Sequence, residues 1–215
     1  LFRSVWSWNA FLAWVCGDVC VWKPSEKTPL CAIACQKIAA KVFADNGIPE
    51  GVSCMINGNA EIGKLLSADK NVALVSATGS TAMGKKVAET VGKRLGKSLL
   101  ELGGNNAMIV TPDADLKITT IAAVFGAIGT CGQRCTSTRR LIVHKDVYND
   151  LKNVLIKAYA QIKIGNPLDE HNHMGPLIDS SAVKQDEKAI TDSVQEGGNI
   201  VCKGGILESE TLQGG

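Results

Sequence analysis

The ten residues from 129 to 138 place two cysteines among glycines and hydroxyl side chains. Glycines let a backbone approach a ligand closely, and N–H groups exposed there can stabilise a developing oxyanion. Arg134 stands directly before Cys135 and favours its thiolate, which is the reactive form of the group. The segment therefore indicates covalent catalysis by Cys135. A tight turn with one incidental thiol is the alternative interpretation.

A second candidate for chemistry is the carboxylate of Glu101, which ends an apolar run and precedes Gly103 and Gly104. Apolar neighbours disfavour the charged form of a carboxylate, so such a group becomes a better general base. A solvated glutamate at the end of a strand would look the same in sequence.

Two polar turns could bind a nucleotide. Lys23-Pro-Ser-Glu26 follows a predicted strand, where open α/β sheets bind ligands, and its lysine and glutamate can hydrogen-bond ribose hydroxyls. Thr78-Gly-Ser-Thr81 precedes a predicted helix, whose first N–H groups suit a phosphate. Neither the G-x-G-x-x-G fingerprint nor a Walker loop is present, so plain helix capping remains an alternative for each turn.

Cysteine usage favours reduced thiols in an intracellular compartment. Most of the eight cysteines lie inside apolar segments and lack the paired spacing of a small secreted scaffold. Cys31 and Cys35 are one helical turn apart, but the histidines offer no second ligand pair at matching spacing. We therefore expect no metal and a cytoplasmic location, or the mitochondrial matrix in a eukaryote.

Composition excludes several classes of protein. With 45% hydrophobic and 20% charged residues, the chain is typical of a globular protein, not a disordered one. The net charge of +2 is spread along the chain, which argues against a nucleic-acid surface. The longest apolar run, residues 10–22, contains Asp18 and is shorter than the roughly 20 residues of a membrane span. The starting Leu1 and the closing Gly214-Gly215 suggest an internal piece of a longer chain.

The elements alternate as in a parallel, doubly wound α/β sheet. A helix is predicted to begin with Thr28 and Pro29 and to close at Gly47, with Leu30, Ile33, Ala34, Ile38, Val42 and Phe43 on one face. Further helices are predicted at residues 60–67, 81–95, 116–128, 147–162 and 182–195. Strands are predicted at residues 19–23, 53–56, 72–76, 98–102, 107–110, 140–144 and 200–202. The pair Gly103-Gly104 marks a domain junction, giving domains of residues 1–102 and 103–215.

Four motifs stand in the order found in the aldehyde dehydrogenase superfamily, which this chain resembles. They are Trp22-Lys-Pro-Ser-Glu-Lys-Thr-Pro29, Thr78-Gly-Ser-Thr81, Glu101-Leu-Gly-Gly104 and Gly132-Gln-Arg-Cys135. The separation of Glu101 and Cys135, 34 positions, also resembles the spacing of the family's glutamate and cysteine. The resemblance extends to near Gly205. It implies a Rossmann-like NAD-binding domain followed by the first part of a catalytic domain.

By this resemblance, Cys135 would attack an aldehyde to give a thiohemiacetal, which loses hydride and leaves a thioester. Glu101 would activate the water that hydrolyses the thioester, so the two side chains should share one cleft. Glu101 favours hydrolysis over acyl transfer to CoA or phosphate, the activity of some relatives. A truncated or inactive nucleotide-binding module is the non-enzymatic alternative.

The resemblance also implies a dinucleotide site for NAD, with NADP as an alternative. Lys23 and Glu26 would hold the adenosine ribose, and Leu102 would approach the nicotinamide. The implied set is Lys23, Ser25, Glu26, Gly63, Gly79, Ser80, Leu102 and Gly103. The family's domain binds NAD without the usual glycine fingerprint, which accounts for the absence of that motif here.

Within the superfamily, Asn105-Asn106 and the run Gly-Gln-Arg-Cys-Thr-Ser-Thr-Arg-Arg resemble the antiquitin group of α-aminoadipic semialdehyde dehydrogenases. The resemblance implies that Arg134 holds the substrate's carboxylate, with Thr136 also at the substrate, and that the full-length enzyme is a homo-oligomer. Tuning the thiol or pairing with an acid is the alternative role for Arg134.

The chain also departs from the family pattern. The family's oxyanion asparagine should fall before Leu1, and its second, nicotinamide-gripping glutamate after Gly215. A chain of these 215 residues alone is therefore expected to turn over poorly. Cys131 stands where the group often has alanine, which invites a disulfide with Cys135.

Overall fold

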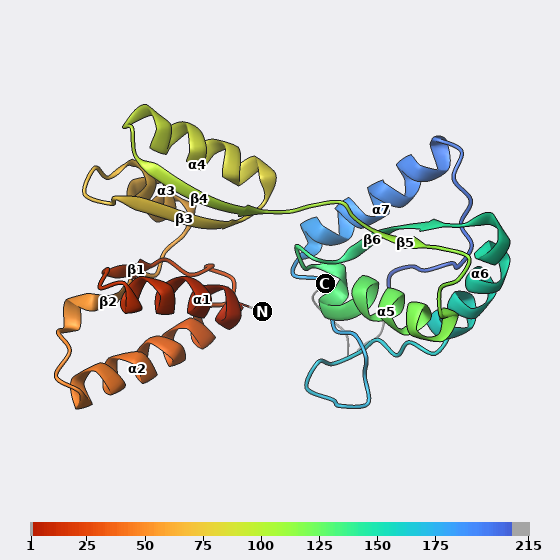
Figure 1. Ribbon diagram of the computed structural model, residues 1–215, viewed down its shortest axis with the longest axis horizontal. Coiled ribbons are helices and arrows are strands. Elements are labelled where there is room, and N and C mark those ends of the chain that lie inside the picture. The colour runs from red at the N-terminus through yellow and green to blue at the C-terminus, as the bar shows by residue number, and fades with distance from the viewer. Residues whose placement is uncertain (1, 208–215) are drawn as a thin grey trace. The chain divides into compact units, whose positions relative to one another are not determined.

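A computed structural model describes residues 2–207 and divides the chain into two compact units, Leu1–Leu102 and Gly103–Gly215 (Figure 1). Leu1 and the closing glycines lie outside the described residues. The first unit contains α1 (Phe2–Val15), β1 (Cys20–Trp22), α2 (Pro29–Asp45), a 3-10 turn (Glu50–Val52), β2 (Ser53–Met55), α3 (Ala60–Ala68), β3 (Leu74–Gly79), α4 (Thr81–Lys93) and β4 (Lys97–Leu102). The second contains β5 (Asn106–Val110), α5 (Leu116–Ile128), a 3-10 turn (Gly129–Gly132), β6 (Thr138–Val143), α6 (Lys145–Tyr159) and α7 (Ser180–Gln195).

The strands of residues 2–207 form three parallel pairs, β1 with β2, β3 with β4 and β5 with β6. A parallel pair needs a crossover, and one helix supplies it each time: α2, α4 and α5 respectively. The predicted α/β class with parallel strands is therefore confirmed. No helix within residues 2–207 has both the length and the apolar character needed to cross a bilayer.

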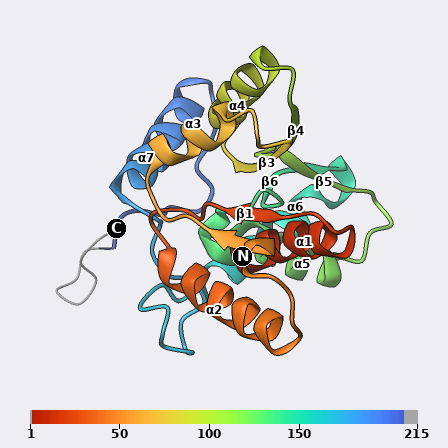
Figure 2. The same ribbon diagram turned by 90° about the vertical axis from the view of Figure 1, so that its left-hand side faces the viewer.

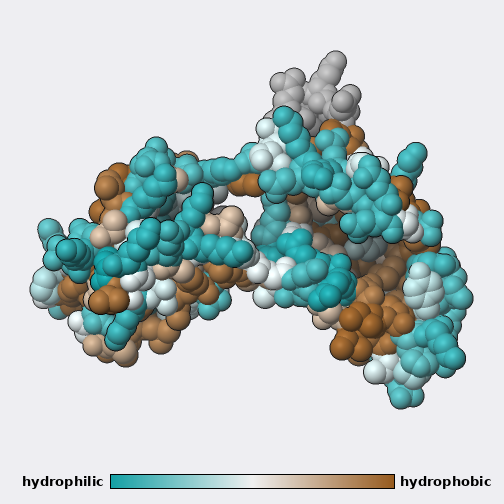
Figure 3. Space-filling view, turned by 90° about the horizontal axis from the view of Figure 1, so that it is seen from above, coloured by the Kyte–Doolittle hydropathy of each residue, from teal (hydrophilic) through white to brown (hydrophobic). Residues whose placement is uncertain are grey.

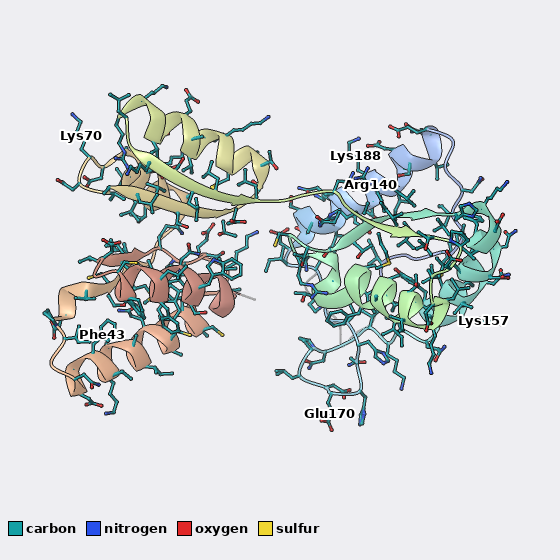
Figure 4. All side chains as sticks on the ribbon, viewed as in Figure 1. Phe43, Lys70, Arg140, Lys157, Glu170 and Lys188 are labelled. Carbon is teal, nitrogen blue, oxygen red and sulfur yellow. The ribbon has the colours of Figure 1, made fainter. Side chains whose placement is uncertain are left out.

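Aromatic rings fill the space between α1, β1 and α2 in the first unit. Trp6 stacks on Trp22 with ring centroids 4.7 Å apart, and Trp14 meets the edge of Phe43 at 4.9 Å (Figure 4). In the same unit α3 and α4 lie side by side, as two views show (Figures 1 and 2). These contacts fix the strand ends from which the polar turns of the unit emerge.

The second unit has its own small core, in which Val110, Ala123 and Leu151 are buried. They come from β5, α5 and α6, and α5 contacts both β6 and α6. Hydrophobic residues nevertheless reach the surface of both units (Figure 3).

The predicted apolar face of α2 is exposed at four of its six residues. They are Leu30, Ala34, Ile38 and Val42, whereas the helix is buried at Ala32 and Ala39. The helix is apolar on nearly all sides, so its periodicity could not select the face that packs. Alanines seven positions apart allow a closer approach to the strands than the larger side chains would.

Other predictions of secondary structure need smaller corrections. Residues 200–202 contain a bend and no strand. The 81–95 helix ends earlier, at Lys93, and Leu95 adopts a positive φ of 58°. Thr28 precedes α2 but makes no side-chain capping bond, so Pro29 at the first turn marks this helix start. The helix α1 was not predicted, because its tryptophans and valines are poor helix formers.

Candidate functional site

Cys135 is exposed and lies on the turn between α5 and β6, residues 129–137, here called the cysteine turn. Its backbone carbonyl accepts a hydrogen bond of 2.7 Å from the side-chain amide of Asn106, at the start of β5. The same nitrogen donates to the carbonyl of Ser137 at 3.0 Å. One side chain therefore fixes the backbone on both sides of Thr136, which is itself exposed.

The cysteine turn begins with an unusual backbone. Thr130, Cys131 and Gly132 follow one another with φ angles of 56°, 55° and 66°. Only glycine adopts this left-handed region without strain, and a β-branched threonine is a clear exception. These three residues turn the chain away from α5 and bring Cys135 to the surface.

Arg134 is held by α5. Its Nη2 donates to the carbonyl of Phe125 at 2.9 Å, and the guanidinium carbon lies 4.8 Å from the centroid of the Phe125 ring. A side chain at Gly129 would collide with this guanidinium, so the glycine makes room for it. The Nε atom is buried and has no hydrogen-bond partner among the described residues. The group is thus oriented by a helix end and an aromatic ring, with one donor unsatisfied.

Cys131 lies half-buried, and its sulfur contacts the backbone of residues 175–176. The thiol donates to the carbonyl of Gly175 at 3.0 Å and lies 3.3 Å from that of Pro176. Burial raises the pKa of this thiol, so it stays protonated. All eight cysteines are free, so Cys131 and Cys135 are not joined as a disulfide in this structure.

Glu101 stands one residue before the end of β4 and is exposed. Its register partner on β3 is Thr78, so the two polar side chains lie on the same face of the strand pair. Leu102 points to the other face, where it packs on α4: a Cβ added to Gly84 would lie 2.5 Å from its Cδ2. Glu101 belongs to the first unit and Cys135 to the second, so their sharing of one cleft stays a prediction.

Lys23 lies at the centre of a cluster of polar groups after β1. Its Nζ donates to the carbonyls of Pro24 at 2.7 Å and Gly58 at 2.8 Å, and lies 3.5 Å from Oε2 of Glu26. A Cβ added to Gly63 on α3 would lie 3.6 Å from the lysine chain. The structure thus brings together three predicted residues, Lys23, Glu26 and Gly63.

The electrostatics of this cluster favour the charged carboxylate. The pKa of Glu26 is lowered, first by a hydrogen bond from its own backbone N–H and then by the nearby Lys23 amine. Ser25 accepts a bond of 3.3 Å from the N–H of Lys27, so its hydroxyl shapes the turn.

Gly79 and Ser80 lie where β3 gives way to α4. The Ser80 hydroxyl caps the helix by accepting from the N–H of Met83 at 3.1 Å. The first N–H groups of a helix have no intrahelical partners and suit an anion. A Cβ at Gly79 would lie 2.6 Å from the end of Met83, and Gly103, after β4, is exposed with open space around it.

Sequence reasoning missed the supporting residues Asn106 and Gln133. Gln133 Oε1 accepts from the N–H of Ile178 at 3.0 Å, 45 positions away. Asn106 belongs to the Asn105-Asn106 pair and Gln133 to the Gly132–Cys135 motif. Their partners are distant in sequence, so no local pattern could reveal these contacts. Within residues 2–207, no group of three or more His, Cys, Asp or Glu side chains is placed to hold a metal ion.

Comparisons with known proteins agree with these motifs. Residues 3–215 match the model of the family described as the aldehyde dehydrogenase family. The chain is 44% identical over 205 residues to the α-aminoadipic semialdehyde dehydrogenase of Bos taurus, covering 95% of this chain and 38% of that protein. It is thus similar to well under half the length of this relative.

Solved structures of similar fold contain bound dinucleotides. Betaine aldehyde dehydrogenase from Staphylococcus aureus in complex with NAD+ superposes with a TM-score of 0.84 at 30% identity, over 92% of this chain and 39% of that one. Glyceraldehyde-3-phosphate dehydrogenase from Methanocaldococcus jannaschii, complexed with NADP, gives a TM-score of 0.84 at 31% identity, over 91% and 42%.

Proposed function

The chain belongs to the aldehyde dehydrogenase family, and from this premise we propose that it supplies the nucleophile and the general base of an NAD(P)-dependent aldehyde oxidation. Cys135 is the proposed nucleophile and Glu101 the proposed base. The observation that carries the proposal is the geometry of the cysteine turn. Asn106 fixes the backbone at Cys135, while the side chain of Cys135 stays exposed. A nucleophile needs both properties, a fixed position and access to substrate.

The residues of the chain have distinct tasks in this reaction. The sulfur of Cys135 bonds to the aldehyde carbon, and after oxidation the substrate stays attached to it as a thioester. A dinucleotide held by the first unit would supply the oxidation as the hydride acceptor. Glu101 takes a proton from the attacking water, the carbon–sulfur bond breaks, and the carboxylate product leaves with Cys135 again a thiolate.

The first unit fits a dinucleotide. Lys23 and Glu26 lie together on one turn with nitrogen and oxygen donors and acceptors for vicinal hydroxyls. The start of α4 after Gly79 and Ser80 presents N–H groups to a diphosphate. Ser25, Gly63, Leu102 and Gly103 complete the proposed set. The NAD and NADP complexes of similar structures support either cofactor.

A semialdehyde that bears a carboxylate is the proposed substrate class. The α-aminoadipic semialdehyde dehydrogenase named above supports it, as does Arg134, which directly precedes Cys135. Its guanidinium is oriented by Phe125, and the residue is only partly buried. A planar guanidinium so held can bind a carboxylate. Thr136, on the other side of Cys135, is the second proposed contact.

Replacing the nucleophile tests the activity. This and the later kinetic tests use a chain of the length of the relatives it matches, because these 215 residues alone are expected to turn over poorly. Cys135→Ala should abolish NADH formation from an aldehyde and leave the Kd for NAD within about three-fold, because binding and chemistry use different residues. Cys16→Ala, at another exposed cysteine, is the matched control and should behave as the wild type. Persistent turnover in Cys135→Ala refutes the assignment.

The substrate class has a separate test. Arg134→Ala should lower kcat/KM by about 100-fold for a carboxylate-bearing semialdehyde, the effect of losing a charged hydrogen bond. For a neutral aliphatic aldehyde the loss should be much smaller. Equal losses for the two substrates exclude a role of Arg134 in binding the substrate's carboxylate. Arg134→Lys shows whether the planar guanidinium is needed.

A further inference from the structure

Two side chains of the cysteine turn reach residues 175–178, here called the docking segment. The Cys131 thiol faces the carbonyls of Gly175 at 3.0 Å and Pro176 at 3.3 Å. The side-chain oxygen of Gln133 accepts from the N–H of Ile178 at 3.0 Å. The cysteine turn thus donates one hydrogen bond through Cys131 and accepts one through Gln133. The two bonds join chain segments that are more than 40 residues apart in sequence.

The docking segment is itself anchored. Just before it, Ile164 and Met174 form a parallel bridge, and the N–H of Gly165 donates to the carbonyl of Met174 at 3.0 Å. Just after it, Asp179 caps α7 by accepting from the N–H of Ala182 at 2.9 Å. Contacts to this segment therefore tie the cysteine turn to a braced part of the second unit.

The backbone of the cysteine turn needs such support. Thr130 and Cys131 hold positive φ angles, which are strained in residues other than glycine and persist only where surrounding contacts impose them. Cys131 and Gln133 lie within and directly after the left-handed residues. Loss of their contacts would let the turn relax toward ordinary backbone angles and move Cys135.

We propose that Cys131 and Gln133 are positioning residues, which hold the cysteine turn on the docking segment and so keep Cys135 in its reactive position. The inference rests on the proposed role of Cys135 as nucleophile. It adds a function for a thiol and an amide that do not take part in the chemistry themselves.

Gln133→Leu is the main test, because leucine keeps much of the volume and removes the acceptor. We expect kcat to fall about ten-fold, as a displaced nucleophile does, with the KM for NAD within about two-fold. Hydrogen exchange at the Ile178 amide should speed up as its bond is lost. Gln185→Leu on α7 is the matched control, because Gln185 is an exposed glutamine outside the turn. It should change neither kcat nor the exchange rate of the Ile178 amide.

The Cys131 pair tests the second contact. Cys131→Ala removes the donor and should lower kcat about three-fold, whereas Cys131→Ser retains a donor and should restore most of the loss. This pair also serves if Gln133→Leu fails to fold. Failure of serine to restore kcat shows that packing and not the hydrogen bond matters, and overturns the inference for Cys131.

The outcomes separate this inference from the proposed function. Normal kcat in Gln133→Leu, together with lost turnover in Cys135→Ala, overturns the inference and leaves the proposed function intact. Parallel losses in kcat and in NAD affinity also overturn it, because they indicate general destabilisation. Turnover in Cys135→Ala refutes the proposed function, and the inference with it.

Discussion

The turn after β1 and the cysteine turn restrain their functional groups in different ways. In the first, the functional amine is itself bonded: Lys23 donates to Pro24 and Gly58 and lies beside Glu26. In the second, the sulfur of Cys135 is exposed, and the bonds go to its backbone carbonyl and to its neighbours. A binding residue can be preorganised through its own side chain, whereas a nucleophile must be placed by others and left free to react.

Asn106→Ala should break this arrangement most severely. The substitution removes the bonds to the carbonyls of Cys135 and Ser137 together. A displacement of the sulfur by about 1 Å would lower kcat by about 100-fold. Steady-state kinetics and the rate of Cys135 alkylation by iodoacetamide measure the effect.

Asn105→Ala is the matched control. The backbone carbonyl of Asn105 accepts hydrogen bonds of 2.8 and 3.2 Å from the guanidinium of Arg140 on β6 (Figure 4). Alanine at position 105 keeps that carbonyl. An equal loss of kcat in both variants would contradict the special role of Asn106.

Gly84→Ala should disturb the first unit through packing, not through its polar turns. The added methyl group would meet Leu102 of β4 at 2.5 Å and cost about 1–3 kcal/mol of unfolding free energy, as overpacking typically does. Gly92→Ala, in the same helix, meets nothing within 4 Å and should stabilise by up to about 1 kcal/mol. Urea denaturation measures both, and equal effects would show that the contact with Leu102 is unimportant.

The smallest effect concerns Glu26 and pH. Because its pKa is depressed in the folded protein, the stabilisation of its charge is complete above the ordinary glutamate pKa and is lost as pH falls through the lowered value. Lys23→Met should move the Glu26 titration upward, toward the ordinary value. Carbon NMR of the carboxyl group follows this directly, and an unchanged titration would mean that the backbone N–H alone lowers the pKa.

Local signals in the sequence account for much of the fold. The α5 helix occupies the predicted residues because Asp115 caps its start and Gly129 ends it, and both act within a few positions. The buried face of α2 could not be predicted, because the helix's own leucine, isoleucine and alanine side chains are spread around its circumference. Which face packs depends on the strands it meets.

The candidate site divides in the same way. Cys135, Glu101 and the Lys23 turn carry local chemical signals and could be proposed from sequence. The supports of the cysteine turn could not, because Asn106 and Gln133 act on residues 29 and 45 positions away. The conformation of Arg134 likewise depends on Phe125 and on the room left at Gly129.

Trapping the covalent intermediate tests the account most directly. In Glu101→Gln, mixed with NAD and an aldehyde, attack by Cys135 should proceed but hydrolysis should stall, because an amide cannot take the proton from water. We predict a burst of about one NADH per active site, with the acyl group found on Cys135 by peptide mass spectrometry. Sustained turnover in this variant, or an acyl group on any other cysteine, would contradict the account.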